Sequence, residues 1–278
     1  MTATLLPPSD RAEHESPARA GQHRVGFRSA VTHSLAITRR NLTQIKSDPA
    51  QLLDATVMPM VFTLVFVYVF GGAIGNGQAD YRQYLIPGIM VQTVSFAAQV
   101  TGVALNMDFS KGVMDRFRSM PIARSAVLSG RILADVCRLA LGQVVILAFA
   151  FLIGFRVHTN VLAVLGAMAL LLLYGIALSW IAAFVGLVIR SPQTVQSMGF
   201  LWMIPLQFGS SMFAPPSTMP GWLRAFVEIN PTTLVVDACR GLLVGGPVAS
   251  NVIGSLLWIG GVLLVFVPLS VRQYGRRT

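Results

Sequence analysis

The chain has 278 residues, of which 54% are hydrophobic and only 12% are charged, and its mean hydropathy is +0.66. A soluble domain carries about 25% charged residues, so this composition excludes an ordinary water-soluble protein. The formal net charge of +10 is explained by anchoring against an anionic membrane surface, and it requires no nucleic-acid partner.

The N-terminal region divides into two segments. Residues 1–28 are predicted to be a disordered cytoplasmic tail, because they are polar and lack the apolar core that a signal peptide would have. Residues 29–48 are predicted to form an amphipathic helix on the membrane surface, with an ordinary surface helix as the alternative. Its helical stripe has five members at spacings of three and four: Val31, Leu35, Thr38, Leu42 and Ile45.

Six long uncharged stretches follow. Crossing a bilayer as a helix takes about 20 apolar residues, and the helix is the default because the backbone must satisfy its own hydrogen bonds in lipid. We therefore predict an all-helical integral membrane protein, with a transmembrane domain over 49–272 and a cytoplasmic tail at 273–278. The six predicted spans are 53–75, 84–106, 132–155, 161–189, 194–214 and 249–270.

The distribution of lysine and arginine predicts the orientation, because these residues favour the cytoplasmic side. Six spans place both termini on one side. That side has sixteen lysine and arginine residues: seven from Arg11 to Lys46, five from Lys111 to Arg131, and then Arg190, Arg272, Arg276 and Arg277. The opposite side has four, namely Arg82, Arg156, Arg224 and Arg240. Both termini are therefore predicted to be cytoplasmic.

A basic island at 107–130 separates the second and third predicted spans. Four apolar residues fall on one side of a short helix that ends at Pro121: Phe109, Val113, Phe117 and Met120. Charged residues cover the rest of it: Asp108, Lys111, Asp115, Arg116 and Arg118. On this pattern alone, a helix that docks a partner protein and a solvated interfacial loop are equally good interpretations.

The external segment 215–248 is broken by prolines and is predicted to form two short helices, near 219–228 and 232–243. Its charged groups are Glu228, Asp237 and Arg240. The last two are three residues apart on one helical face, so they can pair. A role in an external gate and a role as simple interfacial charges remain open.

Charged groups are rare inside the predicted spans. Asp135 and Arg138, again three apart, are interpreted as a structural ion pair in preference to a substrate contact. The middle of every span lacks ionisable residues, which argues against an ion-driven secondary multidrug transporter, because such transporters usually need one near the midplane. No convergent set of histidines and acids predicts a metal site or an enzyme site.

Polar and aromatic residues in spans one, two and five are candidates for a substrate pathway: Thr63, Tyr68, Gln92, Thr93, Gln99 and Gln207. For any one of them, hydrogen bonding between helices is the favoured alternative. A pathway without central charge favours hydrophobic or amphipathic compounds over small ions or sugars.

Several strings resemble the type-2 ABC (ABC-2) exporter permeases, in consistent order from about residue 35 to 270. They are FVYVFGG at 66–72, YLIPGI at 84–89, MPIAR at 120–124, LSGRILAD at 128–135 and NPTTLVVDACR at 230–240. Within that family the chain looks most like the actinobacterial daunorubicin/doxorubicin-resistance permeases.

The resemblance implies a permease subunit of a bacterial plasma-membrane exporter of drug-like metabolites, antibiotics or lipids. Two permease chains, identical or related, would dock two cytoplasmic ATPase subunits. The segment from Asp108 to Met120 would be the coupling helix, with Phe109, Val113 and Phe117 as apolar anchors. The short external helices would be re-entrant and would close the pathway.

This chain is not expected to hydrolyse ATP. A phosphate-binding loop needs the pattern G-x-x-x-x-G-K-[ST], and the two lysines, Lys46 and Lys111, follow Ile45 and Ser110. ATP and Mg²⁺ are therefore expected on the partner ATPase, and no cofactor or metal is expected in this chain.

Overall fold

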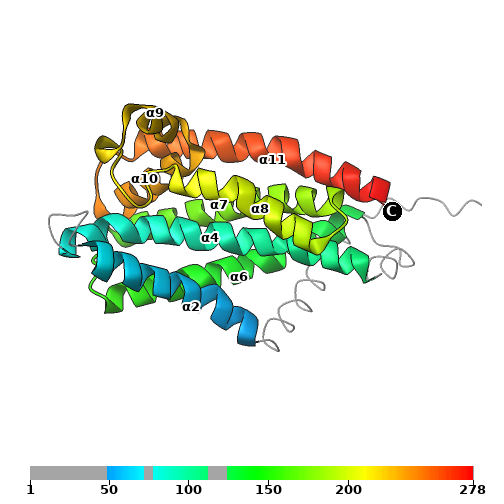
Figure 1. Cartoon of the computed structure of the whole chain (residues 1–278), viewed down its shortest axis with the longest axis horizontal. Coiled ribbons are helices and arrows are strands. Elements are labelled where there is room, and N and C mark those ends of the chain that lie inside the picture. The colour runs from blue at the N-terminus through cyan, green and yellow to red at the C-terminus, as the bar shows by residue number, and fades with distance from the viewer. Residues whose placement is uncertain (1–48, 72–77, 112–123, 278) are drawn as a thin grey trace, which may run out of the picture.

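The computed structural model describes residues 49–71, 78–111 and 124–277. Within these ranges every regular element is a helix and none is a β-strand, so the all-helical prediction is confirmed there. The long helices lie alongside one another, and two short helices, α9 and α10, gather at one end of the molecule (Figure 1). The predicted tail and surface helix at 1–48 lie outside the described residues.

The long helices are α2 (Pro49–Val65), which continues as the π-helix η1 (Phe66–Phe70), α4 (Gln78–Ser110), α6 (Arg124–Leu152), α7 (Val161–Val188), α8 (Pro192–Phe208) and α11 (Ala249–Arg277). The short elements are η2 (Pro216–Thr218), α9 (Gly221–Ile229) and α10 (Pro231–Val244). Helices α9 and α10 lie close to the bounds predicted for two short helices, 219–228 and 232–243, whose external position stays a prediction.

Four helical stretches of the described residues are long and apolar enough to cross a membrane: Tyr81–Ser110, Asp135–Leu152, Val161–Val188 and Ala249–Arg276. The apolar stretch Val57–Val69 is shorter. Helix α8 has 17 residues, which corresponds to about 26 Å, less than the roughly 30 Å hydrocarbon core. The chain is thus a multi-pass membrane protein, and the six-span arrangement stays a prediction.

Several predicted boundaries are wrong. Helix α8 ends at Phe208 and not near residue 214. The reason is the Asn230 side chain, whose Nδ2 donates to the carbonyl oxygens of Leu206 (2.7 Å) and Gly209 (2.6 Å) and so satisfies acceptors that a longer helix would use. At the C-terminus the predicted tail at 273–278 is helical through Arg277.

The basic island is also shorter than the sequence suggested. Helix α4 continues through Ser110, and α6 begins at Arg124, eight residues before the predicted third span. Both ends of the predicted island at 107–130 are therefore turns of these helices. Residues 112–123 lie outside the described part of the chain.

Helices α4 and α7 approach each other at two glycines. A Cβ atom added at Gly102 would lie 2.3 Å from the carbonyl oxygen of Ala182, and one at Gly186 would lie 2.3 Å from that of Gly102. The small residues Ala98 and Ala182 precede these glycines by four positions, as in the small-xxx-small pattern of membrane helix pairs. Backbones can meet this closely only because side chains are absent at the crossing.

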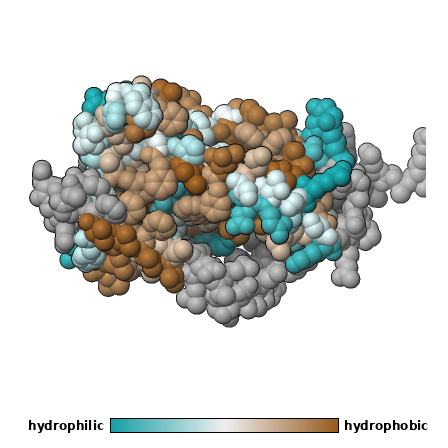
Figure 2. Space-filling view, viewed as in Figure 1, coloured by the Kyte–Doolittle hydropathy of each residue, from teal (hydrophilic) through white to brown (hydrophobic). Residues whose placement is uncertain are grey.

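Hydrophobic side chains also cover much of the outer surface. Large apolar residues that are exposed in the monomer lie on α2, η1, α6, α8 and α11, among them Val69, Val144, Leu201 and Leu264. Figure 2 shows hydrophobic residues along the flanks of the bundle and hydrophilic ones gathered at the end where the C-terminus lies. A bilayer accounts for this distribution, because lipid is as apolar as the protein interior.

We expect Gly102→Ala to destabilise the protein by about 1–3 kcal/mol, because the new methyl group meets backbone that cannot move without separating α4 from α7. The measurement is the midpoint of thermal unfolding in detergent. Gly142→Ala is the matched control, since nothing lies within 4 Å of its added Cβ. Equal midpoints for the two variants would contradict the close crossing.

Candidate functional site

The antiparallel helices α4 and α8 form a seam along one side of the bundle. A Cβ atom added at Gly199 would lie 1.3 Å from Nε2 of Gln99, and one at Gly88 would lie 2.6 Å from the carbonyl oxygen of Met212. Between these two contacts, Phe96 and Phe200 have ring centroids 6.2 Å apart. The contacts set the register of the pair and bring the predicted residue Gln99 onto α8.

Two further predicted residues, Gln92 and Gln207, belong to the same seam. The register places the two side chains at the same depth along the bundle. Gln92 lies one turn after Gly88 on α4, and Gln207 lies five residues before Met212 in the antiparallel segment. Each is 2% exposed. The Nε2 atoms of both amides have no hydrogen-bond partner among the described residues. A buried amide without a partner is costly, so these donors are suited to an acceptor atom of a ligand.

The remaining predicted pathway residues do not join this pair. The hydroxyl of Thr63 donates to the carbonyl oxygen of Pro59 (2.7 Å), and that of Thr93 donates to Ile89 (2.8 Å), so each is satisfied by its own helix. Tyr68 is 53% exposed on η1. Of the six candidates, Gln92, Gln99 and Gln207 are therefore brought together along one seam, and Thr63, Thr93 and Tyr68 are not.

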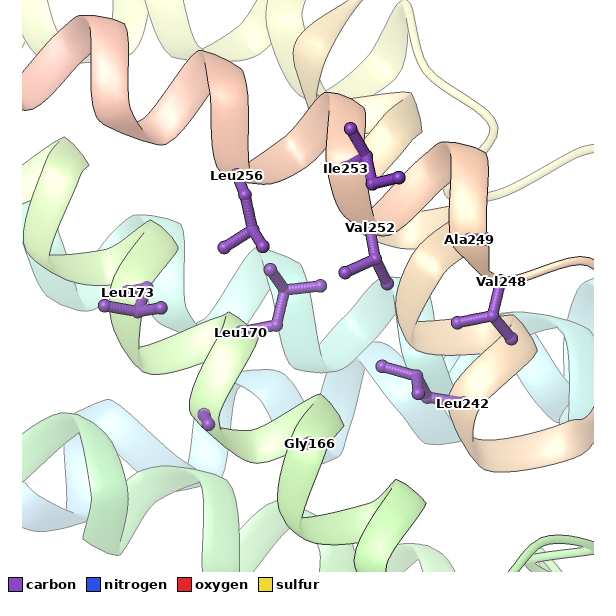
Figure 3. Close-up of a pocket in the computed structure, with 10 residues that line it drawn as sticks. Gly166, Leu170, Leu173, Leu242, Val248, Ala249, Val252, Ile253 and Leu256 are labelled. Atoms are coloured by element: carbon purple, nitrogen blue, oxygen red, sulfur yellow. The ribbon is translucent and has the colours of Figure 1, made fainter.

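An apolar groove of about 540 Å³ lies elsewhere, between α7, α10 and α11 (Figure 3). The side chains that line it are all aliphatic or glycine, and Leu170, Leu242 and Val252 point into it. None of the predicted pathway residues lines this groove. It has no polar group with which to orient a ligand, so it can accept only an apolar chain.

At the α9–α10 end, Arg240 of α10 is the centre of a polar cluster. Its guanidinium pairs with Asp237, donates from Nε to the carbonyl oxygen of Tyr84 (3.2 Å) and donates from Nη2 to that of Ser211 (3.0 Å). It also lies 3.7 Å from the centre of the Tyr84 ring. One side chain thus joins α10, the start of α4 and the loop after α8.

The other members of the cluster hold the loop 209–213. The hydroxyls of Tyr84 and Tyr81 donate to the carbonyl oxygens of Ser211 (2.6 Å) and Phe213 (3.0 Å), and Ser211 Oγ donates to Asp237 Oδ1 (2.7 Å). The predicted pair of Asp237 and Arg240 is therefore formed, whereas Glu228 is exposed on α9 and does not join this cluster. Sequence reasoning missed both tyrosines and Ser211, since no local spacing relates them to Arg240.

Cys239, next to Arg240, is fully buried. Burial raises the pKa of its thiol to about 12, although the nearby Arg240 cation acts in the opposite direction. The thiol is therefore protonated at neutral pH and unreactive while the fold is intact. Among the described residues no group of three His, Cys, Asp or Glu side chains is arranged to hold a metal ion.

The second predicted ion pair ties α6 to α4. Arg138 lies 3.1 Å from Asp135, and it also donates to the carbonyl oxygen of Ala97 (2.8 Å). Asp135 Oδ2 accepts a hydrogen bond from the Thr101 hydroxyl (2.7 Å). Both charged side chains face protein partners, in agreement with a structural role.

The predicted docking segment is only partly described. Val113, Asp115, Arg116, Phe117, Arg118 and Met120 lie outside the described residues. Asp108, Phe109 and Lys111 are described, at the end of α4. The Phe109 ring packs edge-on against Tyr274 of α11, with centroids 5.4 Å apart. This intramolecular contact favours a positioning role for Phe109 over a direct contact with a partner.

Comparison with known proteins decides the family. Residues 32–244 match the family described as ABC-2 type transporter. This chain belongs to the ABC-2 type transporter family.

Two relatives illustrate the similarity of this ABC-2 chain to drug-resistance permeases. The daunorubicin resistance ABC transporter permease protein DrrB1 of Streptomyces coeruleorubidus is 38% identical over 260 residues, which cover 94% of this chain and 89% of the relative. The doxorubicin resistance ABC transporter permease protein DrrB of Mycobacterium tuberculosis (strain H37Rv) is 32% identical over 200 residues, 69% of each chain. The resemblance found in the sequence is thereby confirmed.

We expect Arg240→Lys to lower the free energy of unfolding by roughly 3 kcal/mol, because an ammonium cannot reproduce the forked contacts to two carbonyl oxygens and a carboxylate. Thermal exposure of the buried Cys239 thiol to a maleimide dye reports unfolding, in a background in which the exposed Cys137 is replaced by serine. Arg224→Lys is the control, since Arg224 is exposed and its Nε donates to the carbonyl oxygen of Pro216 within the same short segment. Similar shifts for the two variants would argue against a central role for Arg240.

Proposed function

We propose that this chain is the membrane-spanning permease subunit of an ATP-driven exporter of hydrophobic or amphipathic compounds, with ATP hydrolysed by a separate subunit. The observation that carries the proposal is the similarity to a daunorubicin resistance permease over 94% of this chain and 89% of that relative. The missing phosphate-loop pattern in the full sequence supports the separate ATPase, on which ATP and Mg²⁺ bind.

In the proposed topology, six spans cross a bacterial plasma membrane, and both termini are cytoplasmic. The first span is α2 together with η1, and the others are α4, α6, α7, α8 and α11. The cationic residues support this orientation. The C-terminal end of the bundle carries Lys111, Arg190, Arg272 and Arg276. The α9–α10 end is then external, and α9 and α10 are the re-entrant helices that close the pathway from outside.

The Arg240 cluster is the proposed external gate. Its contacts join α10, α4 and the loop after α8, so opening the pathway at this end requires several of them to break together. Asp237 takes part directly through its pair with Arg240. Exposed Glu228 lies on α9 and contributes an interfacial charge.

The α4–α8 seam is the proposed substrate pathway. Its amide donors on Gln92 and Gln207 favour an amphipathic compound with carbonyl, ether or hydroxyl oxygens. Apolar surface along the helices favours the hydrophobic part of the same compound. The alternative function, an ion-driven transporter, is less well supported, because the pair of acidic and basic groups in α6, Asp135 and Arg138, is already neutralised internally.

The partners in this proposal are membrane lipids, a second permease chain and two ATPase subunits. The segment from Asp108 to Met120 is the proposed coupling helix. Since Phe109 packs within the chain, the anchors for the ATPase are assigned to Val113, Phe117 and Met120, with Arg116 and Arg118 facing acidic residues of the ATPase.

Co-purification with the ABC ATPase from the neighbouring reading frame tests the docking segment. We expect Phe117→Ala to weaken ATPase binding about tenfold, because truncating one central apolar anchor usually removes more than 1 kcal/mol. Trp222→Ala, an exposed aromatic residue on α9 at the other end of the bundle, is the matched control. The proposal fails if reconstituted vesicles transport daunorubicin on a proton gradient with no ATPase present.

Transport kinetics test the seam. We expect Gln92→Leu and Gln207→Leu each to raise KM for daunorubicin roughly fivefold, since each removes one hydrogen-bond donor worth about 1 kcal/mol. The control is Gln143→Leu, because Gln143 of α6 is fully buried and neither of its amide atoms has a partner among the described residues. An unchanged KM in both seam variants, or an equal rise in the control, would remove the seam from the pathway.

A further inference from the structure

At the C-terminal end of the bundle, α4, α7 and α11 meet in a second hydrophobic cluster, separate from the main core. Its buried members come from all three helices: Leu105, Trp180, Ala183, Leu187 and Tyr274. Partly buried side chains of α4 and α11, including Phe109 and Phe266, pack against it. The cluster therefore contacts the docking segment directly, through Phe109 at the end of α4.

Helices α4 and α7 are held in close contact beside this cluster. Their backbones meet at Gly102 and Gly186, with no room for a Cβ atom at either position. One turn beyond, the Asn106 amide donates to the carbonyl oxygens of Gly186 (2.9 Å) and Ile189 (2.6 Å) and so holds the last turn of α7. A displacement of the end of α4 therefore carries the end of α7 with it.

Helix α11 joins this pair through aromatic contacts. The rings of Phe184 on α7 and Phe266 on α11 meet edge-on with centroids 5.7 Å apart, and Ser270 Oγ donates to the carbonyl oxygen of Trp180 (3.4 Å). One turn further along, Tyr274 is 3% exposed and meets Phe109 edge-on. The contact between Phe109 and Tyr274 thus joins the first turn of the docking segment to α11.

We propose that Tyr274 is a positioning residue that transmits the displacement of the docking segment to α11. The ring of Phe109 moves with the first turn of that segment, and Tyr274 passes the movement to α11 and, through the shared cluster, to α7. This inference rests on the proposed function and deepens it, since it assigns a route by which ATPase motion reaches α11 and α7.

Among the described side chains, which in α6 begin at Asp135, the contacts favour a route through α11. The polar contacts of α4 with α6 involve Ala97 and Thr101, two or more turns before Phe109. The Tyr274 contact is made at Phe109 itself, one residue before the last residue of α4. Among the side chains that the structure describes, the contact with α11 therefore lies nearer to the end of α4 than the polar contacts with α6 do.

The test compares Tyr274 variants in the full complex of permease and ATPase, reconstituted in vesicles with daunorubicin as the probe. We expect Tyr274→Ala to retain the ATPase on co-purification, yet to lower the number of daunorubicin molecules moved per ATP hydrolysed roughly 3- to 30-fold, the range typical of changes along a coupling route. Tyr274→Phe keeps the ring and should restore the ratio to within twofold.

Two controls separate coupling from stability. Trp258→Ala removes another aromatic contact of α11 with α7, the ring pair with Tyr174 at 5.8 Å, on the opposite side of the helix midpoint from Tyr274. It should lower the unfolding midpoint as much as Tyr274→Ala does while the transport-to-ATP ratio stays that of the unmodified complex. Leu264→Ala, at an exposed site on α11, should change neither quantity.

The double variant Phe109→Ala/Tyr274→Ala gives a further check. If the two rings act as one contact, the double variant should be no worse in the transport-to-ATP ratio than the poorer single variant. The inference is overturned if Tyr274→Ala transports with an unchanged ratio, or if Trp258→Ala lowers the ratio equally. If the unmodified chain neither binds the ATPase nor transports with ATP, the proposed function fails and not this inference alone.

Discussion

The close approach of α4 and α7 is the contact on which the rest of the structure depends. In a bilayer, helices gain little from burying apolar side chains against one another, because the lipid is equally apolar. Their association relies instead on near backbone contact and on buried hydrogen bonds. Gly102 and Gly186 permit that contact, and Asn106 adds two hydrogen bonds one turn away. The three residues together make α4 and α7 a rigid pair around which the other helices pack.

Because α4 is held by α7 on one face, its other faces carry the features that matter for function. At one end Tyr84 meets the Arg240 cluster, in the middle Gln92 faces α8, and at the other end Phe109 meets α11. The two ends of α4 are held by polar and aromatic contacts, whereas in its middle the Nε2 atom of Gln92 has no hydrogen-bond partner among the described residues. This combination suits the pathway proposed for the α4–α8 seam, since a pathway must bind a passing compound without closing permanently on itself.

Local spacing was sufficient to predict some of these features. Asp135 with Arg138 and Asp237 with Arg240 are three residues apart, so a helix brings each pair together whatever the tertiary fold. The partners of Arg240 could not be found in the same way, because Tyr84 precedes it by 156 residues. Likewise Phe109 was assigned to a docking face from its helical position, although the fold packs its ring against Tyr274.

The sequence by itself determined the membrane class, the approximate positions of the long helices that the structure describes, the local ion pairs and the family. These follow from hydropathy, from helix-capping and proline signals, and from short motifs. The tertiary structure alone decided which faces of the helices meet, how far α8 extends, and that Gln92, Gln99 and Gln207 share one seam. The physical reason is that lipid-facing and protein-facing surfaces of a membrane helix are both apolar, so the hydrophobic pattern that orients a soluble helix carries little information here.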